Sequence, residues 1–249
     1  MPVLYGINAV LEALRADPAR IERVSVQRGL ASPRIQAIID LARHAGAPLV
    51  FEDRTWLDRK AGGGRHQGVI CHISEAATFS AEEVLRQASS PGLLLILDGV
   101  EDPQNLGATL RSAEVAGVDG VFIPQRRSAS LSASVVKASA GAATHVKVAR
   151  VSNTSQTIEL VKSSGYWVTG LAGDAETRLW EIDFLVPTAL VVGSEGSGLH
   201  RLVREKCDFL TSIPLRGKVG SFNVSVAAGI SLYEVLRQRS LAPSAHKEK

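Results

Sequence analysis

Six short apolar runs follow residue 92, and they constrain the fold more than any other feature of the sequence. Short apolar runs of this kind are typical of strands that are buried on both faces. Helix-like segments separate most of them, which favours a mostly parallel sheet with helices on both faces. We therefore predict an α/β domain over residues 92–240. The runs are LLLIL (93–97), GVFIP (120–124), HVKVARV (145–151), YWVTGLA (166–172), ALVVG (189–193) and FLTSIPL (209–215).

A smaller α/β unit is predicted over residues 1–73. Apolar residues at helical spacing predict a helix over 5–15. A second helix is expected to begin at Pro33, with Ser32 as its cap and Gly46 near its end. Strands are expected at 22–27, 47–52 and 66–73.

Two segments are predicted to lie outside these domains. Residues 74–91 are rich in Ser and Ala, contain one short helix at most, and are interpreted as a linker. The polar residues 241–249 are interpreted as a disordered tail.

The bulk composition excludes several classes of protein. The chain has 28 basic and 25 acidic residues, a net charge of +3, which permits a nucleic-acid partner without establishing one. Cys71 and Cys207 lie far apart without metal-ligand spacing, which argues against a disulfide framework and a zinc site. The N-terminus does not resemble a signal peptide, and no run of about 18 apolar residues predicts a membrane span. We expect a cytoplasmic protein without a bound metal.

The first stretch that could carry chemistry is LDGVEDPQNLGATLRSAEVAG, residues 97–117. A strand ends at Leu97, and Asp102 can cap a helix whose first residue is Pro103. Gly107 and Arg111 lie four apart and share a helix face. An arginine there presents a planar fork suited to phosphate, although an exposed arginine on an ordinary helix fits the same pattern.

The second stretch is ALVVGSEGSGL, residues 189–199, in which a buried strand leads into Gly193, Gly196 and Gly198. Glycine-rich turns after a strand allow backbone N–H groups to reach a nucleotide-like ligand. The order of the glycines differs from the dinucleotide fingerprint, and no Gly-Lys-Ser/Thr follows as in a P-loop. A plain turn explains this loop equally well when it is considered alone.

The third stretch is KVGSFNVSVAAG, residues 218–229, which leads into an apolar helix. Ser and Asn at the start of a helix commonly serve as caps. All three stretches leave the carboxyl ends of predicted strands, where ligands gather in open α/β sheets. Capping and ligand binding are therefore both open interpretations of Ser221, Asn223 and Ser225.

Together the three stretches resemble the signature motifs of the SpoU-type ribose methyltransferases of the SPOUT superfamily. Residues 98–117 match Asn-x-Gly-x-x-x-Arg, residues 191–199 match Gly-x-Glu-x-x-Gly-Leu, and residues 213–234 match Ile-Pro…Ser-x-Asn-Val-Ser…Tyr-Glu. YGINAVLEAL near the N-terminus and HQGV at 66–69 resemble the small RNA-binding domain attached to such enzymes. The resemblance covers nearly the whole chain.

This resemblance implies a deep trefoil knot in the C-terminal domain, whose loops hold S-adenosylmethionine. By position, Gly193, Ile213 and Phe222 offer backbone contacts to the cofactor, and Gly196 and Gly198 belong to the same loop. The family usually has Leu where this chain has Phe222, a substitution that keeps the apolar contact.

The resemblance also implies which residues serve catalysis. Arg111 is the residue that the family assigns to this role, sometimes as a general base, but a guanidinium stays protonated at neutral pH. We therefore expect Arg111 to orient the target phosphate and to raise the acidity of the 2′-hydroxyl. Asn105 and Glu195 are expected to support the first and second loops, and Glu195 alternatively touches substrate. Asn223 and Ser225 are expected to cap the last helix and to line the reaction centre.

The substrate implied is RNA, because the 2′-hydroxyl distinguishes RNA from DNA. Full-length resemblance favours a guanosine in 23S ribosomal RNA, and transfer RNA is the nearest rival. A homodimer is implied as well. Two other classes stay open, a catalytically silent RNA-binding protein of the same fold and, less well supported by the order of its glycines, a nucleotide-dependent oxidoreductase.

Overall fold

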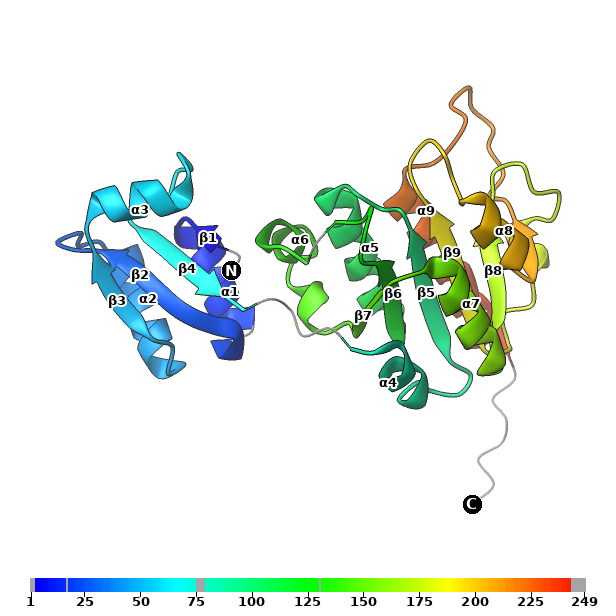
Figure 1. The fold of residues 1–249 in the computed structure, drawn as a ribbon, viewed down its shortest axis with the longest axis horizontal. Coiled ribbons are helices and arrows are strands. Elements are labelled where there is room, and N and C mark those ends of the chain that lie inside the picture. The colour runs from blue at the N-terminus through cyan, green and yellow to red at the C-terminus, as the bar shows by residue number, and fades with distance from the viewer. Residues whose placement is uncertain (1–2, 17, 75–78, 130, 243–249) are drawn as a thin grey trace, which may run out of the picture. The chain divides into compact units, whose positions relative to one another are not determined.

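Two β-sheets organise the chain (Figure 1), and each belongs to its own compact unit. The computed structural model describes residues 3–16, 18–74, 79–129 and 131–242. One unit comprises Met1–Ala77 with Leu131–Thr144, and the other comprises Thr78–Ser130 with His145–Lys249. None of the helices in the described ranges combines the length and apolar character needed to cross a membrane.

The N-terminal unit has a four-stranded mixed sheet in the order β1-β4-β2-β3. Strand β4 is antiparallel to both of its neighbours, whereas β2 and β3 are parallel. Apolar residues of α1, α2 and one face of the sheet form its core. Its elements are β1 (Val3–Tyr5), α1 (Ile7–Ala16), η1 (Pro18–Arg20), β2 (Ile21–Gln27), α2 (Pro33–His44), β3 (Leu49–Glu52), α3 (Arg54–Ala61), β4 (Val69–Ile73), α6 (Ala133–Ala138) and η2 (Ala142–Thr144).

The predicted start of α2 is confirmed, whereas the helix predicted over 5–15 is wrong at its first residues. The hydroxyl of Ser32 accepts the N–H of Ile35 at 3.2 Å, and Pro33 is the first helical residue. In contrast, Tyr5 pairs with Ile70 in the sheet, and Gly6 has a φ of 97°, which a helix does not allow. The first helix therefore begins at Ile7.

The C-terminal unit has a six-stranded sheet in the order β10-β8-β9-β5-β6-β7, and every strand pair in it is parallel. This confirms the predicted mostly parallel sheet with helices on both faces. Its elements are α4 (Ala81–Arg86), β5 (Leu93–Asp98), α5 (Pro103–Val115), β6 (Gly120–Pro124), β7 (Val148–Val151), α7 (Thr154–Ser163), β8 (Trp167–Leu171), η3 (Leu179–Glu181), β9 (Thr188–Gly193), α8 (Arg201–Lys206), β10 (Phe209–Thr211) and α9 (Val224–Leu241).

Helices cover both faces of this sheet (Figure 1). On one face, residues of α4, α7 and α8 form a core with alternate residues of the strands. Helices α5 and α9 pack against each other, and α9 contacts β9. Both faces of the central strand β5 are therefore buried, which explains why all six of its residues are buried and five of them are Leu or Ile.

The segment interpreted as a linker contains ordered structure. The N–H of Phe79 bonds to the carbonyl of Val148, and Ser80 caps α4 in a reciprocal capping box with Glu83. Val84 is fully buried in the core of the C-terminal unit. Residues 75–78, and residues 243–249 of the predicted tail, lie outside the described residues, and the domain boundaries stay a prediction.

Candidate functional site

Three loops begin at the carboxyl edge of the six-stranded sheet. Strands β5 and β9 are adjacent and in register, so that Asp98 lies beside Gly193. The loops after these strands therefore start next to each other, and the third loop, residues 212–223, connects β10 to α9. Parallel strands place their carboxyl ends at one edge, which is why distant stretches of sequence meet here.

The loop after β9 depends on its glycines for two different reasons. A Cβ on Gly193 would lie 2.1 Å from the carbonyl carbon of Gly198, because the loop folds back over this residue. Gly196 and Gly198 have φ values of 87° and 67°, which side-chain-bearing residues rarely adopt. Ser194 and Gly198 exchange two backbone hydrogen bonds of 3.0 Å, which closes the loop.

A buried carboxylate holds the far end of the same loop. Asp98, at the end of β5, is only 4% exposed. Its Oδ2 accepts both the backbone N–H and the ring Nδ1 of His200 at 2.9 Å. Asp98 therefore ties the start of α8 to the central strand.

The loop after β5 begins α5 as the sequence predicts. The carboxylate of Asp102 accepts the N–H groups of Gln104 and Asn105, and Pro103 is the first helical residue. This cap places Asn105 in the first turn of the helix, at the edge of the sheet.

Three side chains, one from each loop, form a polar network. Asn105 Nδ2 donates to Glu195 Oε2 at 3.1 Å. Asn223 Nδ2 donates to Glu195 Oε1 at 2.8 Å and to Asn105 Oδ1 at 2.9 Å. Glu195 thus accepts one amide on each oxygen, and the three loops are cross-linked. We call these three residues the polar triad.

Asn223 joins the polar triad to the start of the last helix. Its Oδ1 accepts the backbone N–H of Ser225 at 3.0 Å and the hydroxyl of Ser225 at 2.6 Å. The amide oxygen therefore caps α9 while the amide nitrogen holds the other two loops. Of the two interpretations that the sequence left open, capping is confirmed for this residue, and ligand binding stays a prediction.

A cleft of about 590 Å³ lies beside the polar triad. Glu195 lines the cleft and so belongs to both features. The five residues predicted to contact a cofactor all line this one cleft, namely Gly193, Gly196, Gly198, Ile213 and Phe222. Phe222 is 40% exposed.

Arg111 belongs neither to the cleft nor to the polar triad. It lies on α5, its side chain is exposed, and among the described residues it forms no ion pair. It neither lines the cleft nor bonds to the polar triad. Within the described chain, the structure thus brings together four of the five residues predicted for catalysis and leaves Arg111 as a free cation.

Family models cover almost all of the described chain. Residues 92–233 match the SpoU rRNA Methylase family. The chain belongs to this family. Residues 3–79 match a second model, RNA 2′-O ribose methyltransferase substrate binding. The SpoU family model therefore contains every residue of the three loops.

Similar proteins share both parts of the chain. The chain is 43% identical over 240 residues, 95% of this chain and 96% of the relative, to the 23S rRNA (guanosine-2′-O-)-methyltransferase RlmB of Pseudomonas aeruginosa. It is 41% identical over 240 residues, 96% and 99% of the two chains, to the protein of that name from Escherichia coli. A crystal structure of an RNA 2′-O ribose methyltransferase superposes with a TM-score of 0.71 at 28% identity, covering 96% of this chain and 89% of the other.

A more distant structure shares the fold. The SpoU methyltransferase AviRb from Streptomyces viridochromogenes, in complex with AdoMet, superposes with a TM-score of 0.74 at 22% identity. The superposition covers 96% of this chain and 90% of that one.

Sequence reasoning missed one wall of the SpoU cleft, the segment 171–174 after β8. Asp174 lines the cleft and accepts Arg204 Nη1 at 2.8 Å. This hydrogen bond lowers the pKa of the Asp174 carboxyl. The signal was available, since the predicted strand 166–172 ends at the same sheet edge as the three motifs.

Among the described residues no group of three or more His, Cys, Asp and Glu side chains could hold a metal ion.

Proposed function

We propose that this chain transfers the methyl group of S-adenosylmethionine to the 2′-hydroxyl of a guanosine ribose in 23S ribosomal RNA. The observation that carries the proposal is the polar triad, which joins the three SpoU motifs beside a single cleft. The relatives that match the chain along their whole length are named for this reaction.

The cleft fits S-adenosylmethionine in size and in the chemistry of its walls. Its volume falls within the usual range of about 300–1,000 Å³ for small-molecule sites. Leu171, Ile213, Leu215 and Phe222 supply apolar surface for a purine. The left-handed turns at Gly196 and Gly198 leave the space where a Cβ would stand open, so that a ligand can approach the backbone.

Electrostatics at the cleft also suit a positively charged cofactor. Glu195 and Asp174 line the cleft, and its one cation, Arg204, pairs with Asp174. Among the described residues no cation forms an ion pair with the Glu195 carboxylate. Its two hydrogen bonds come from neutral amides and leave the charge in place. We propose that Gly193, Gly196, Gly198, Ile213 and Phe222 hold the cofactor and that Glu195 faces its positive charge.

When bound, the cofactor supplies a methyl group carried on a positively charged sulfur. This sulfur is a good leaving group, so that no metal is needed to activate the methyl group. Methyl transfer from it to the ribose oxygen would leave the sulfur as a neutral thioether, and the hydroxyl proton would pass to solvent. The Arg111 guanidinium would stabilise the developing negative charge on the oxygen while it holds the neighbouring phosphate. The polar triad fixes the three loops so that the hydroxyl and the methyl group meet in line.

The choice of 23S RNA over transfer RNA rests on coverage. A TrmH/SpoU tRNA-modifying enzyme from A. aeolicus is 30% identical, but it covers only 64% of this chain, with a TM-score of 0.55. The relatives named for 23S RNA cover 95% or more of it. The relatives named for 23S RNA therefore match the N-terminal unit as well, and this full-length match favours the ribosomal target.

We further propose that the chain works as a cytoplasmic homodimer, since ribosomal RNA is modified in that compartment. Val226 and Tyr233, seven residues apart on α9, share one helix face and are 46% and 68% exposed. Val115, on the neighbouring helix α5, is 74% exposed. Exposed apolar residues on two packed helices are typical of an interface with another chain. Light scattering on the purified protein tests this, and a monomeric mass at micromolar concentration would contradict it.

The test of the proposed function is to map 2′-O-methyl groups on 23S RNA from cells with and without this protein. We expect one guanosine to lose its methyl group when the protein is absent and to regain it when the gene is restored. If 23S RNA is unchanged but a transfer RNA loses a methyl group, the rival target is correct. If neither RNA changes and the protein still binds RNA, it is a silent member of the family.

A further inference from the structure

The sheet of the N-terminal unit has one well-covered face and one partly covered face. Residues such as Val24 and Cys71 point into the core with α1 and α2. The opposite face meets only the eight-residue helix α3, through Leu57 and Ala61 packed near Ile70.

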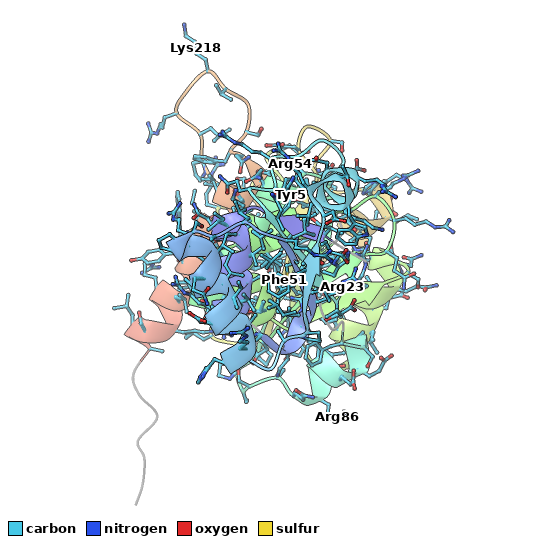
Figure 2. All side chains as sticks on the ribbon, turned by 90° about the vertical axis from the view of Figure 1, so that its left-hand side faces the viewer. Tyr5, Arg23, Phe51, Arg54, Arg86 and Lys218 are labelled. Atoms are coloured by element: carbon cyan, nitrogen blue, oxygen red, sulfur yellow. The ribbon has the colours of Figure 1, made fainter. Side chains whose placement is uncertain are left out.

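Arg23 and His72 belong to this partly covered face. They lie directly opposite each other on the antiparallel strands β2 and β4, and Val3 of β1 pairs with His72 on the other side. Arg23 is labelled in Figure 2. Cross-strand partners share a face of the sheet, so these side chains stand together.

A tryptophan from α3 borders the same face of the sheet. The Arg23 guanidinium carbon lies 5.3 Å from the centre of the Trp56 ring, and the Lys60 ammonium lies 5.7 Å from it. The ring of His72 is 6.0 Å from that of Trp56. We call Arg23, Trp56, Lys60 and His72 the Trp56 cluster.

The two cations of the Trp56 cluster have no acidic partner among the described residues. Neither Arg23 nor Lys60 forms an ion pair there, although Arg28 pairs with Asp53 and Arg54 with Asp58 in the same unit. Two like charges on one aromatic ring repel each other, and the ring alone offsets this only in part. Such an arrangement is favourable when an anion binds between the charges.

His72 adds no third charge to the cluster. It is only 8% exposed, and its Nδ1 has no hydrogen-bond partner among the described residues. Burial, followed by the charges of Arg23 and Lys60, lowers the pKa of its imidazole, whereas Glu22 raises it. The ring is therefore neutral at pH 7 and packs beside the Trp56 ring without adding charge.

We propose that the Trp56 cluster binds a single strand of RNA, with Arg23 and Lys60 on its phosphates and the indole of Trp56 against a base. This rests on the proposed function, because it assumes an RNA substrate. A positively charged groove with an aromatic ring is the usual means of holding single-stranded nucleic acid. Seven basic residues of this unit are candidates from the sequence alone, namely Arg23, Arg28, Arg34, Arg54, Arg59, Lys60 and Arg65, and only two of them converge on this ring.

The first experiment measures the binding of a fluorescein-labelled oligouridylate to the full-length protein across a salt series. The variant R23Q/K60Q loses two phosphate contacts, so its salt slope falls by about 1.4 log units per log unit of salt. The matched control R34Q/R43Q removes two exposed arginines from α2 and keeps the wild-type slope. Trp56→Leu keeps an apolar side chain and binds about 5- to 150-fold more weakly with an unchanged slope, as expected for one lost stack.

The second experiment follows the tryptophan itself. The chain has three tryptophans, so W167F/W180F leaves Trp56 as the sole reporter. Oligouridylate quenches its fluorescence if a base stacks on it, and R23Q/K60Q shifts that titration to higher concentration.

The results separate this inference from the proposed function. Equal affinities and slopes for R23Q/K60Q and R34Q/R43Q, with no quenching of Trp56, overturn the RNA site even if the wild-type protein methylates 23S RNA. A wild-type protein that quenches on RNA but never transfers a methyl group overturns the proposed function and leaves the RNA site standing.

Discussion

The polar residues of the two units differ in whether they have partners. In the C-terminal unit, Asn105, Glu195 and Asn223 bond to one another across three loops. In the N-terminal unit, Arg23 and Lys60 approach one tryptophan without an acidic partner among the described residues. A set of side chains whose hydrogen bonds are internal is a scaffold, whereas charges without partners are suited to an external ligand.

Arg111 extends the comparison into the C-terminal unit. It lies on the same helix as Asn105, yet no hydrogen bond or ion pair within the described chain holds its guanidinium. By this criterion we propose that Arg111 acts on a ligand, as we propose for Arg23 and Lys60, and that the polar triad supports it. A role of Arg111 on the ligand and a role of the polar triad as a scaffold predict different effects on turnover and on cofactor affinity.

Arg111→Ala is expected to have the largest effect. Turnover on RNA should fall by about 10²–10³, the usual cost of removing one group that stabilises a developing oxyanion. Affinity for S-adenosylmethionine, measured by calorimetry, should stay at the wild-type value because Arg111 does not line the cleft. The control Arg201→Ala removes an exposed arginine of α8 that pairs with Glu205. Unaltered methyl transfer by Arg111→Ala would remove this residue from the mechanism.

Asn223→Ala should give the next largest effect, and it tests the scaffold. It leaves the Glu195 carboxylate with one hydrogen bond fewer, which weakens the site by about 1.5–3 kcal/mol, or roughly 10- to 150-fold. Because the loops lining the cleft lose their cross-link, cofactor affinity should fall together with turnover, unlike in Arg111→Ala.

The matched control for Asn223→Ala is Asn153→Ala. Asn153 caps α7 through the N–H groups of Ser155 and Gln156 and takes no part in the polar triad. Both variants should lose about 0.5–2 kcal/mol of stability with the cap, as measured by denaturant unfolding. Only Asn223→Ala should lose cofactor affinity, and equal affinities for the two variants would mean that the polar triad does not shape the cleft.

Gly196→Ala tests whether the scaffold extends to the backbone. A Cβ at this position meets no atom within 4 Å, so any effect arises from the φ of 87° rather than from a clash. The left-handed conformation costs a side-chain-bearing residue about 1–2 kcal/mol, which corresponds to cofactor binding roughly 5- to 30-fold weaker if the loop shifts to relieve it. Gly217→Ala has equal space and no positive φ, and calorimetry should find its affinity unchanged.

The sequence predicts the buried parts of the fold better than the parts made by long-range contacts. Apolar runs locate the strands of the six-stranded sheet, most clearly β5, whose six residues are all buried. The run 209–215 is the exception, since the strand ends at Thr211 and Ile213 instead lines the cleft. The strand Val3–Tyr5 was missed because only its pairing with β4 makes those three residues a strand.

In the candidate site, too, local features are predicted from the sequence and long-range contacts are not. Asp102 and Asn223 are recognisable as caps because capping is local, and both predictions are confirmed. The polar triad joins residues 90 and 118 positions apart, and only the sheet topology brings them together. Helix α3 was missed as well, and with it the position of Trp56 beside Arg23. The trefoil knot stays a prediction.

The smallest expected effect concerns the surplus positive charge of the Trp56 cluster, and His72 reports it. Burial and the charges of Arg23 on β2 and Lys60 on α3 lower the pKa of His72 in the folded protein, against the opposing effect of Glu22 on β2. The folded state therefore disfavours the charged ring. Its contribution to stability is fully present above the unfolded pKa of about 6.5 and is lost as the pH falls through that value toward the lower folded pKa.

His72→Phe removes this titration while keeping a ring of similar shape. In the W167F/W180F background, denaturant unfolding of the N-terminal unit can be followed by the fluorescence of Trp56 alone. Between about pH 8 and pH 5 the protein with His72 should lose more stability than the His72→Phe variant, because all other titrating groups are shared and cancel in the difference. In K60Q the loss should shrink, since one of the positive charges that oppose protonation is gone. Parallel pH profiles with and without the His72→Phe substitution would show that the cluster carries no surplus charge, and the contrast between the two units would then rest on geometry alone.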